Sequence, residues 1–242
     1  MAGVPLLAVH AHPDDESLWT GGVLARAAAQ GIGTAVMTCT SGELADGSSF
    51  AAPGTRTGEL GAALAELRVG ESRMLGYADR ALNDVPLDVV VGELAAYISE
   101  LRPVAVVTYD AFGLSGHPDH IRVHEATLGA VEAAADEWAV EQVWLATVPQ
   151  ELADVLTDAA GEERVRAGAG GPYVAVDVRD WLDVKWRALR SHDSEFARGA
   201  RVAALDRHPE LREVALGTEY FQYLAGPGTE SAEGRAVRGL FA

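Results

Sequence analysis

The segment that decides the fold lies near the N-terminus and reads Pro5-Leu6-Leu7-Ala8-Val9-His10-Ala11-His12-Pro13-Asp14-Asp15-Glu16. Its apolar first half is typical of a buried β-strand. In α/β proteins, functional groups gather where the strands of the sheet end. An imidazole, His12, and two adjacent carboxylates, Asp14 and Asp15, stand at that position. We therefore expect this segment to supply both a buried strand and part of a functional site.

Apolar runs alternate with segments of helical periodicity along the rest of the chain. This alternation is typical of βαβ units around a mostly parallel sheet. Strands are predicted near residues 4–10, 34–40, 72–76, 104–109, 142–148 and 173–178. Helices are predicted at 18–30, 57–67, 87–101 and 120–134, which are rich in Ala, Leu and Glu and contain no internal proline. The sequence thus predicts a Rossmann-like three-layer α/β sandwich with a mostly parallel central sheet.

The chain length of 242 residues fits one large domain, so we expect a single domain over residues 1–242. The tail at 226–242 is rich in Gly, Pro and Glu, and we expect it to be flexible. The segment 45–57 is rich in Gly, Ser and Pro and is longer than most connections in compact domains. Loops of that length are often lids or binding loops.

Composition excludes several classes of partner. The net charge of −17 disfavours nucleic acids and anionic membranes, because such ligands need a basic surface. No apolar run approaches the ~18 residues of a membrane span. The start of the chain lacks a basic leader region, and a single cysteine, Cys39, cannot form an internal disulfide. We expect a cytoplasmic enzyme with a small-molecule substrate, and the sequence leaves open whether it forms a homo-oligomer.

A second motif, His117-Pro118-Asp119-His120, repeats the His-Pro-Asp theme after another strand-like run. A catalytic zinc usually has three protein ligands and one open position for water. His12, Asp15 and His120 could supply those ligands, which leaves Asp14 free to act as the base. His117, as an imidazolium, could stabilise the oxyanion or protonate the leaving amine, with Asp119 holding its ring by a hydrogen bond. The two motifs together predict metal-assisted amide hydrolysis.

Other interpretations stay open at this point. Asp14, Asp15 and Asp119 stand before predicted helices and could be N-caps. Two histidines and one carboxylate also form the iron site of non-haem Fe(II) oxygenases, although such enzymes gain nothing obvious from Asp14. A binding module without catalysis is disfavoured, because the sequence contains neither a GxGxxG motif nor a P-loop. We assign His10 to strand packing, and His124 to a place outside the ligand set.

The paired motifs resemble those of the LmbE-like (PIG-L) family of zinc-dependent deacetylases, which act on N-acetylglucosamine-containing substrates. The resemblance is strong over about the first half of the chain. It includes Thr38-Cys39-Thr40-Ser41-Gly42-Glu43, Leu75-Gly76-Tyr77, Tyr109-Asp110 and, farther on, Ser191-His192-Asp193-Ser194.

This resemblance implies a zinc enzyme, with Fe²⁺ as the alternative metal, that acts on a small N-acetylated amino sugar or its conjugate. It implies the same ligands, base and acid as above, and sugar contacts from Arg56 and Asp79. Glu43 is a weaker candidate for a substrate contact. Some family members carry a substrate-polarising tyrosine two residues before the first histidine of the second motif, and here that position is Ser115. This departure leaves the identity of the substrate open.

Overall fold

The computed structural model describes residues 4–44, 52, 54–154, 167–168, 171–198, 205–226 and 230–242. Within these residues, seven strands form one sheet in the order β3-β2-β1-β4-β5-β7-β6. Their bounds are Leu6–His10 (β1), Thr34–Leu44 (β2), Glu71–Asp79 (β3), Ala105–Tyr109 (β4), Gln142–Thr147 (β5), Val174–Asp177 (β6) and Thr218–Ala225 (β7). Strands β1 to β5 pair in parallel, and β7 runs antiparallel to both β5 and β6. The prediction of a Rossmann-like sandwich with a mostly parallel sheet is confirmed.

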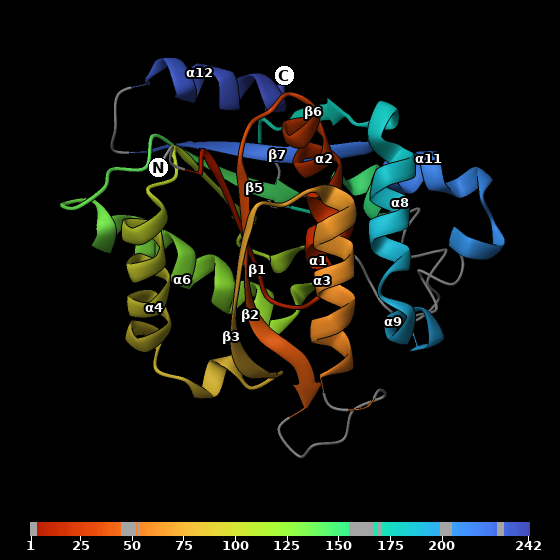
Figure 1. The fold of residues 1–242 in the computed structure, drawn as a ribbon, viewed down its shortest axis with the longest axis horizontal. Coiled ribbons are helices and arrows are strands. Elements are labelled where there is room, and N and C mark those ends of the chain that lie inside the picture. The colour runs from red at the N-terminus through yellow and green to blue at the C-terminus, as the bar shows by residue number, and fades with distance from the viewer. Residues whose placement is uncertain are drawn as a thin grey trace.

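Helices cover both faces of the sheet (Figure 1). The α-helices are Asp15–Trp19 (α1), Gly21–Ala29 (α2), Thr55–Leu67 (α3), Leu87–Leu101 (α4), Gly113–Gly116 (α5), Pro118–Ala134 (α6), Leu182–Arg190 (α8), Asp193–Arg198 (α9), Glu210–Leu216 (α11) and Ala232–Arg238 (α12). Short 3₁₀ helices are Leu82–Asp84 (η1), Arg179–Trp181 (η2) and Gly239–Phe241 (η3).

The side chains of β1 alternate between two apolar cores, as the two-residue period of a strand requires. Leu7 and Val9 belong to the core on the side of α4 and α6. Leu6 and Ala8 belong to the other core, with side chains of α2 and α3. Figure 1 shows α4 and α6 on one side of the sheet and α3 and α8 on the other. Because β1 is buried on both faces, it reads as a continuous apolar run in the sequence.

Two elements differ from the prediction. β7 was not predicted, although Thr218–Ala225 contains three aromatic residues, and it separates β5 from β6 in the sheet. The helix predicted at 18–30 is two helices, α1 and α2, that meet at Thr20. Glycine is a poor helix former, and α2 begins with two. The second, Gly22, lies so close to Val178 that an added Cβ would be 2.5 Å from the Val178 side chain.

The C-terminal tail packs against the sheet, contrary to the expectation that 226–242 is flexible. Residues 227–229 lie outside the described part, and the chain resumes at 230. The Phe241 ring stacks on Trp144, with centroids 4.2 Å apart, and meets Phe221 edge to face. Arg26 donates a hydrogen bond of 3.1 Å to the Leu240 carbonyl. The apolar C-terminal residues thus complete a core. Their packing holds the tail in place although the segment before them is polar.

The predicted binding loop at 45–57 is described only in part. Residues 45–51 and 53 lie outside the described residues, and Thr55 already belongs to α3. The lid expectation for this segment therefore stays a prediction.

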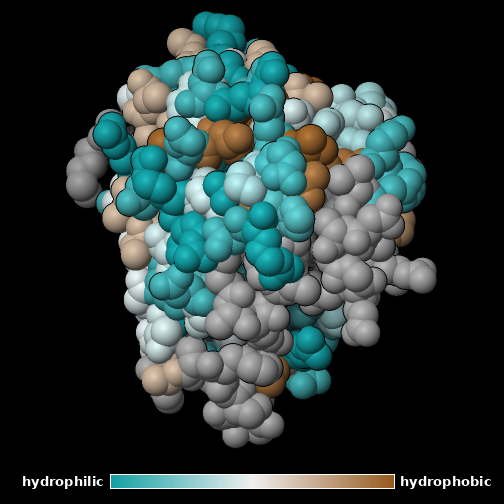
Figure 2. Space-filling model, turned by 90° about the vertical axis from the view of Figure 1, so that its right-hand side faces the viewer, coloured by the Kyte–Doolittle hydropathy of each residue, from teal (hydrophilic) through white to brown (hydrophobic). Residues whose placement is uncertain are grey.

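The face that carries α8 and α11 is mostly hydrophilic over its described atoms, with small apolar areas between polar side chains (Figure 2). This agrees with the charged-residue content of 23%. Among the described helices, none is both long enough and apolar enough to cross a membrane.

Candidate metal centre

The two His-Pro-Asp motifs meet at one end of the sheet. β1 and β4 are neighbours, and the sheet continues in opposite directions from them, to β2 and to β5. Such a reversal opens a crevice at the carboxyl ends of the two strands, where α/β proteins bind ligands. His12 comes shortly after β1, while His117 and His120 come shortly after β4. The topology therefore brings together residues that are far apart in the sequence.

Three donor atoms converge in this crevice. His12 Nδ1 lies 3.1 Å from His120 Nε2. Asp15 Oδ2 lies 3.4 Å from His12 Nδ1 and 3.3 Å from His120 Nε2. All three side chains are buried. In a tetrahedral zinc site with bonds of ~2.0–2.1 Å, neighbouring ligand atoms lie about 3.3 Å apart. The triangle of donor atoms thus has the dimensions of one face of such a site.

His120 is fixed in the protonation state that a metal ligand needs. Its Nδ1 lies 3.0 Å from the Gly113 carbonyl oxygen, which can only accept, so Nδ1 carries the proton. The Nε2 lone pair therefore faces His12 and Asp15. Gly113 has a φ of +61°, and an added Cβ would lie 2.7 Å from the His120 Cβ. Glycine at this position permits the close approach that makes the hydrogen bond.

His12 is held in the complementary way, with its Nε2 facing carboxylates. Nε2 lies 3.2 Å from Asp119 Oδ2 and 3.1 Å from Asp79 Oδ1. Carboxylates only accept, so Nε2 carries a proton, and Nδ1 is the ring nitrogen left to bind a metal once it releases its own proton. Burial lowers the pKa of His12, but Asp119, Asp15 and Asp79 together raise it well above its usual value. Asp79 in turn has its pKa lowered to about 2, because His12 outweighs the effect of burial.

The Asp119 carboxylate contacts a different histidine from the one predicted. We expected it to hold the His117 ring, but it bonds to His12 Nε2 and accepts the backbone N–H groups of Arg80 (2.7 Å) and Leu82 (3.3 Å). It is the Asp119 backbone N–H that donates to His117 Nδ1, at 3.2 Å. His117 is the N-cap of α6, and this capping bond sets the direction of its ring.

His117 is neutral rather than an imidazolium. Its Nδ1 accepts the Asp119 N–H, so the single ring proton lies on Nε2. Burial and the nearby His12 and His120 lower its pKa to about 4. The proton on Nε2 is therefore a fixed donor, directed to the side of Asp79 Oδ1, which lies 3.9 Å away.

Two residues that had no predicted role, Tyr109 and Trp19, support Asp15. The Tyr109 hydroxyl donates to Asp15 Oδ2 at 2.6 Å, and the Trp19 indole N–H donates to Oδ1 at 3.1 Å. The Tyr109 ring also stacks on His120, with centroids 4.3 Å apart. Although burial opposes it, the two histidines hold the pKa of Asp15 well below its usual range. The spacing of Trp19, four residues after Asp15 at a helix start, is the signal that could have identified it.

Asp14 stands beside the donor triangle in an unusual conformation. Its φ of 117° lies in the left-handed region, and its side chain makes no capping hydrogen bond, although it occupies the N-cap position of α1. Burial raises the pKa of its carboxyl to about 8, against the opposing effect of Arg56. The capping alternative therefore finds no support at Asp14.

The Arg56 guanidinium interacts with other residues of the same chain. Its guanidinium donates to the carbonyls of Gly42 (3.0 Å) and Pro13 (2.5 Å) and lies 3.4 Å from Asp14 Oδ2. It also lies 3.5 Å from the Glu195 carboxylate. Arg56 thus joins the loops beside Asp14, and its Nε atom is buried without a partner among the described residues.

The remaining predicted residues lie at different distances from the cluster. Asp79 is at the centre, where its buried Oδ1 lies 3.1 Å from His12 Nε2. Ser115 is half-buried on α5, close to His117 in the sequence. Glu43 accepts the Gly54 backbone N–H at 2.7 Å, which ties β2 to the start of α3. The described contacts of Glu43 do not include the histidines.

The described residues contain further sets of donors that could hold a metal ion. One set is His12, His117 and His120, and another is His12, Asp79, His117 and Asp119, each with its atoms within 4.8 Å of one another. In the second set, the His12 Nε2 proton is already shared with carboxylates. The His12, Asp15 and His120 triangle is the set in which each histidine has its other ring nitrogen bound to an acceptor.

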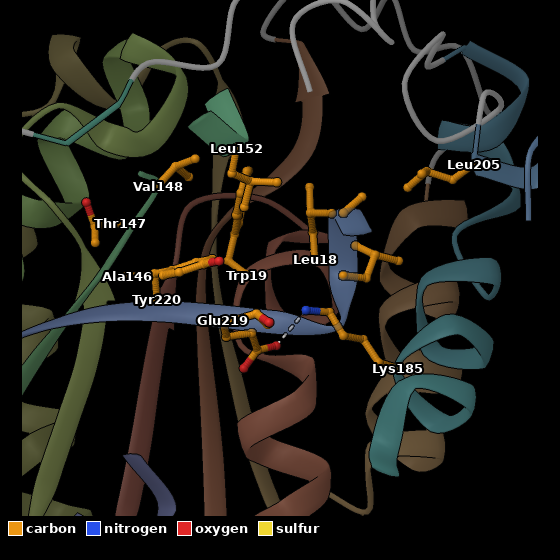
Figure 3. Close-up of a pocket in the computed structure, with 13 residues that line it drawn as sticks. Leu18, Trp19, Ala146, Thr147, Val148, Leu152, Lys185, Leu205, Glu219 and Tyr220 are labelled. Atoms are coloured by element: carbon orange, nitrogen blue, oxygen red, sulfur yellow. Dashed lines mark hydrogen bonds and ion pairs between the residues drawn. The ribbon is translucent and has the colours of Figure 1, made fainter. Parts of the chain in front are cut away.

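A cavity between β5, β7 and α8 is lined mainly by apolar side chains (Figure 3). Trp19 is part of its wall and also contacts Asp15. Lys185 and Glu219 face each other at the cavity, with Nζ 2.6 Å from Oε1. Glu219 also accepts the backbone N–H groups of Gly22 and Val23 at the start of α2. This buried pair links α2, α8 and β7.

Comparison with known proteins decides the family. The profile of the PIG-L family, described as GlcNAc-PI de-N-acetylase, matches residues 7–131, a range that contains both motifs. The chain belongs to the PIG-L family. The resemblance of the paired motifs to this family is thereby confirmed.

Relatives of this PIG-L protein carry a more specific name. A 1D-myo-inositol 2-acetamido-2-deoxy-alpha-D-glucopyranoside deacetylase of Actinosynnema mirum is 36% identical over 283 residues, covering 98% of this chain and 95% of the relative. A protein of the same name from Mycolicibacterium vanbaalenii is 39% identical over 285 residues, covering 97% and 94%. Both alignments are longer than this chain of 242 residues, so each relative has residues that face gaps here.

A solved structure shares the PIG-L fold. The N,N'-diacetylchitobiose deacetylase from Pyrococcus horikoshii superposes with a TM-score of 0.68 at 17% identity, covering 93% of this chain and 85% of that chain. At this identity the likeness shows the fold alone.

Proposed function

We propose that this protein is a metal-dependent N-deacetylase that hydrolyses the N-acetyl group, or a related N-acyl group, of a small amino sugar or its conjugate. The observation that carries this proposal is the triangle of His12 Nδ1, His120 Nε2 and Asp15 Oδ2 with a separate carboxylate, Asp14, beside it. A metal ligand set with an adjacent base is what hydrolysis of an amide by water needs. The family and the names of the relatives support the same reaction.

The proposed ligands are His12, Asp15 and His120, and the proposed metal is Zn²⁺. Donor distances of 3.1–3.4 Å fit a tetrahedral ion, and both histidines have their other nitrogen bound to an acceptor. When bound, Zn²⁺ would supply a Lewis acid that lowers the pKa of water and polarises the substrate carbonyl. Fe²⁺ accepts the same donors, and metal analysis separates the two.

Asp14 is the proposed general base. Its carboxylate takes a proton from the attacking water as the water oxygen forms a bond with the carbonyl carbon. Burial, partly offset by Arg56, raises its pKa to about 8, and a neighbouring divalent cation would lower the pKa again. A base with a pKa near the working pH can both accept the proton and release it.

His117 is the proposed oxyanion donor. Its Nε2 proton is fixed by the Asp119 N–H on the opposite ring nitrogen, so Nε2–H can donate to the carbonyl oxygen as negative charge develops there. A neutral ring has no second proton to give to the amine. We therefore assign the protonation of the leaving nitrogen to Asp14, which returns the proton it took from water as the C–N bond breaks. Acetate and a free amine result.

Asp79 is the proposed contact for a substrate hydroxyl. Its Oδ1 has an unused acceptor position next to His12 and His117. Arg56 donates to two backbone carbonyls and lies beside Asp14, so we propose that it supports Pro13 and Asp14 more than it contacts the sugar. The charge of −17 favours a neutral sugar conjugate over a phosphorylated one. The relatives have residues that this chain lacks, and this difference favours an aglycone other than the inositol in the relatives' names.

The test is a panel of N-acetylated amino sugars and their conjugates, including one with inositol as the aglycone. Free amine and acetate are measured after metal removal by a chelator and after addition of Zn²⁺ or Fe²⁺ alone. We expect amine and acetate in equal amounts, only with metal present, and without oxygen consumption. Turnover that consumes oxygen, or equal turnover in the metal-free protein, would contradict the proposal.

A further inference from the structure

The backbone of Asp14 is strained. Its φ of 117° and ψ of −28° lie in a region that favours glycine. A residue with a side chain stays in such a conformation only where its surroundings hold it. The contacts of the Asp14 backbone therefore show which groups keep its carboxylate in place.

Glu16 provides one such contact. Its Oε2 accepts the backbone N–H of Asp14 at 2.9 Å, and the Glu16 side chain is fully buried. The other oxygen, Oε1, accepts the Ser17 hydroxyl. Glu16 is not among the donor atoms of the metal centre, so its buried charge needs another explanation. Its carboxylate fixes the peptide that carries Asp14.

His192 reaches the same carboxylate from a distant part of the chain. Its Nε2 lies 2.9 Å from Glu16 Oε1, and because a carboxylate only accepts, Nε2 donates the proton. His192 is 1% exposed. It lies between α8 and α9, where its N–H donates to the Leu189 carbonyl and its own carbonyl accepts the Glu195 N–H. Two helix ends thus hold His192 against Glu16.

We propose that His192 is a positioning residue for the reaction, because it orients Glu16, which in turn holds Asp14 in its strained conformation beside the metal ligands. The chain of contacts runs from His192 Nε2 to Glu16 and from Glu16 to the Asp14 N–H. This inference rests on the proposed function for the role of Asp14. The contact between His192, Glu16 and the Asp14 N–H is independent of the proposed function, because amide exchange measures it without turnover.

Three substitutions at one position separate positioning from general stability. His192→Leu removes the donor, and His192→Asn has an amide too short to reach Glu16. His192→Gln places an amide N–H near the position of Nε2 and restores the donor. Ser191→Ala is the matched control, since this hydroxyl bonds to the Arg187 carbonyl at the helix surface. For each folded variant we would measure kcat, KM, metal content and the amide exchange rate of Asp14.

We expect kcat to fall about 100-fold in His192→Leu and His192→Asn, with KM and metal content unchanged, since a small displacement of a catalytic group has effects of this size. His192→Gln should recover kcat to within about tenfold of the wild type. The Asp14 amide should exchange faster in the first two variants than in His192→Gln, and Ser191→Ala should match the wild type in every measurement.

The proposal is overturned if folded His192→Leu or His192→Asn keeps wild-type kcat and Asp14 exchange, or if His192→Gln is no better than His192→Leu. Loss of metal with loss of kcat would assign His192 to metal binding instead. If His192→Leu does not fold, His192→Asn decides. Wild type and Asp14→Ala are assayed alongside: if the wild type hydrolyses nothing, the proposed function fails, while Asp14 exchange still tests the contact.

Discussion

The hydroxyl oxygen of Tyr109 lies 2.6 Å from Oδ2 of Asp15, the same oxygen that faces both histidines of the donor triangle. Tyr109 stands at the end of β4, and Asp15 begins α1 after β1. The bond therefore links the segment after β1 to the end of β4. These are the two neighbouring strands from which the strand order runs outward in opposite directions. The Tyr109 oxygen also accepts the Ala11 backbone N–H at 2.6 Å, so it is held from both sides.

Replacement of Tyr109 by Phe removes this hydrogen bond and keeps the ring that stacks on His120. We expect metal affinity to fall about 10- to 100-fold, because groups that orient ligands have effects of this size. Competition with a chelator of known affinity measures the change. Unchanged metal affinity would show that Asp15 is oriented without Tyr109, and Trp19→Phe provides the parallel test of the other Asp15 oxygen.

The buried pair of Lys185 and Glu219 is expected to be important for stability. Both side chains are almost fully buried, at 1% and 2% exposure. Lys185→Met leaves the carboxylate without its cation and should lower the free energy of unfolding by about 3–5 kcal/mol. Denaturant unfolding measures the change.

An exposed ion pair that also involves α8 serves as the control. Arg187 and Glu66 form an exposed ion pair, so Arg187→Met should change the free energy of unfolding by less than about 1 kcal/mol. A double substitution, Lys185→Met with Glu219→Gln, removes the unpaired charge and should be more stable than Lys185→Met alone. Equal losses for Lys185→Met and Arg187→Met would contradict this interpretation of the buried pair.

Packing of the C-terminus gives a separate prediction. Phe241→Ala removes a ring that is 2% exposed and stacked on Trp144, and it should cost about 3–5 kcal/mol of stability. KM should not change, because Phe241 is outside the metal centre. Val214→Ala on α11, at 55% exposure, is the control and should have little effect. A Phe241→Ala protein as stable as the wild type would mean that the tail is not docked in solution.

Local sequence was enough to predict the parallel strands and the main helices. β1 and β4 are continuous apolar runs because they are buried on both faces, and such runs are visible without any knowledge of the fold. β7 has a less distinct pattern, since it pairs antiparallel with β5 and β6 near the edge of the sheet. The docking of Phe241 depends on Trp144, a contact that no local pattern contains.

The candidate site shows the same division. Motif spacing was enough to predict that His12, Asp15 and His120 lie together, because a strand end fixes where they lie. The partner of the Asp119 carboxylate was not predicted. The Asp119 backbone N–H binds His117 as a helix cap, and the carboxylate is left to bind His12. Tyr109 and His192 act through hydrogen bonds across the fold, and their residue types alone give no such indication.

The most direct test compares Asp14→Ala with His120→Ala, with metal content and kcat measured on the same preparations. Asp14 is the proposed general base, and His120 is a proposed metal ligand. Asp14→Ala should therefore bind metal as the wild type does while kcat falls about 10²- to 10⁴-fold, the range for loss of a general base. His120→Ala should lose the metal. An Asp14→Ala protein that keeps wild-type kcat, or a His120→Ala protein with full metal content, would contradict the assignment.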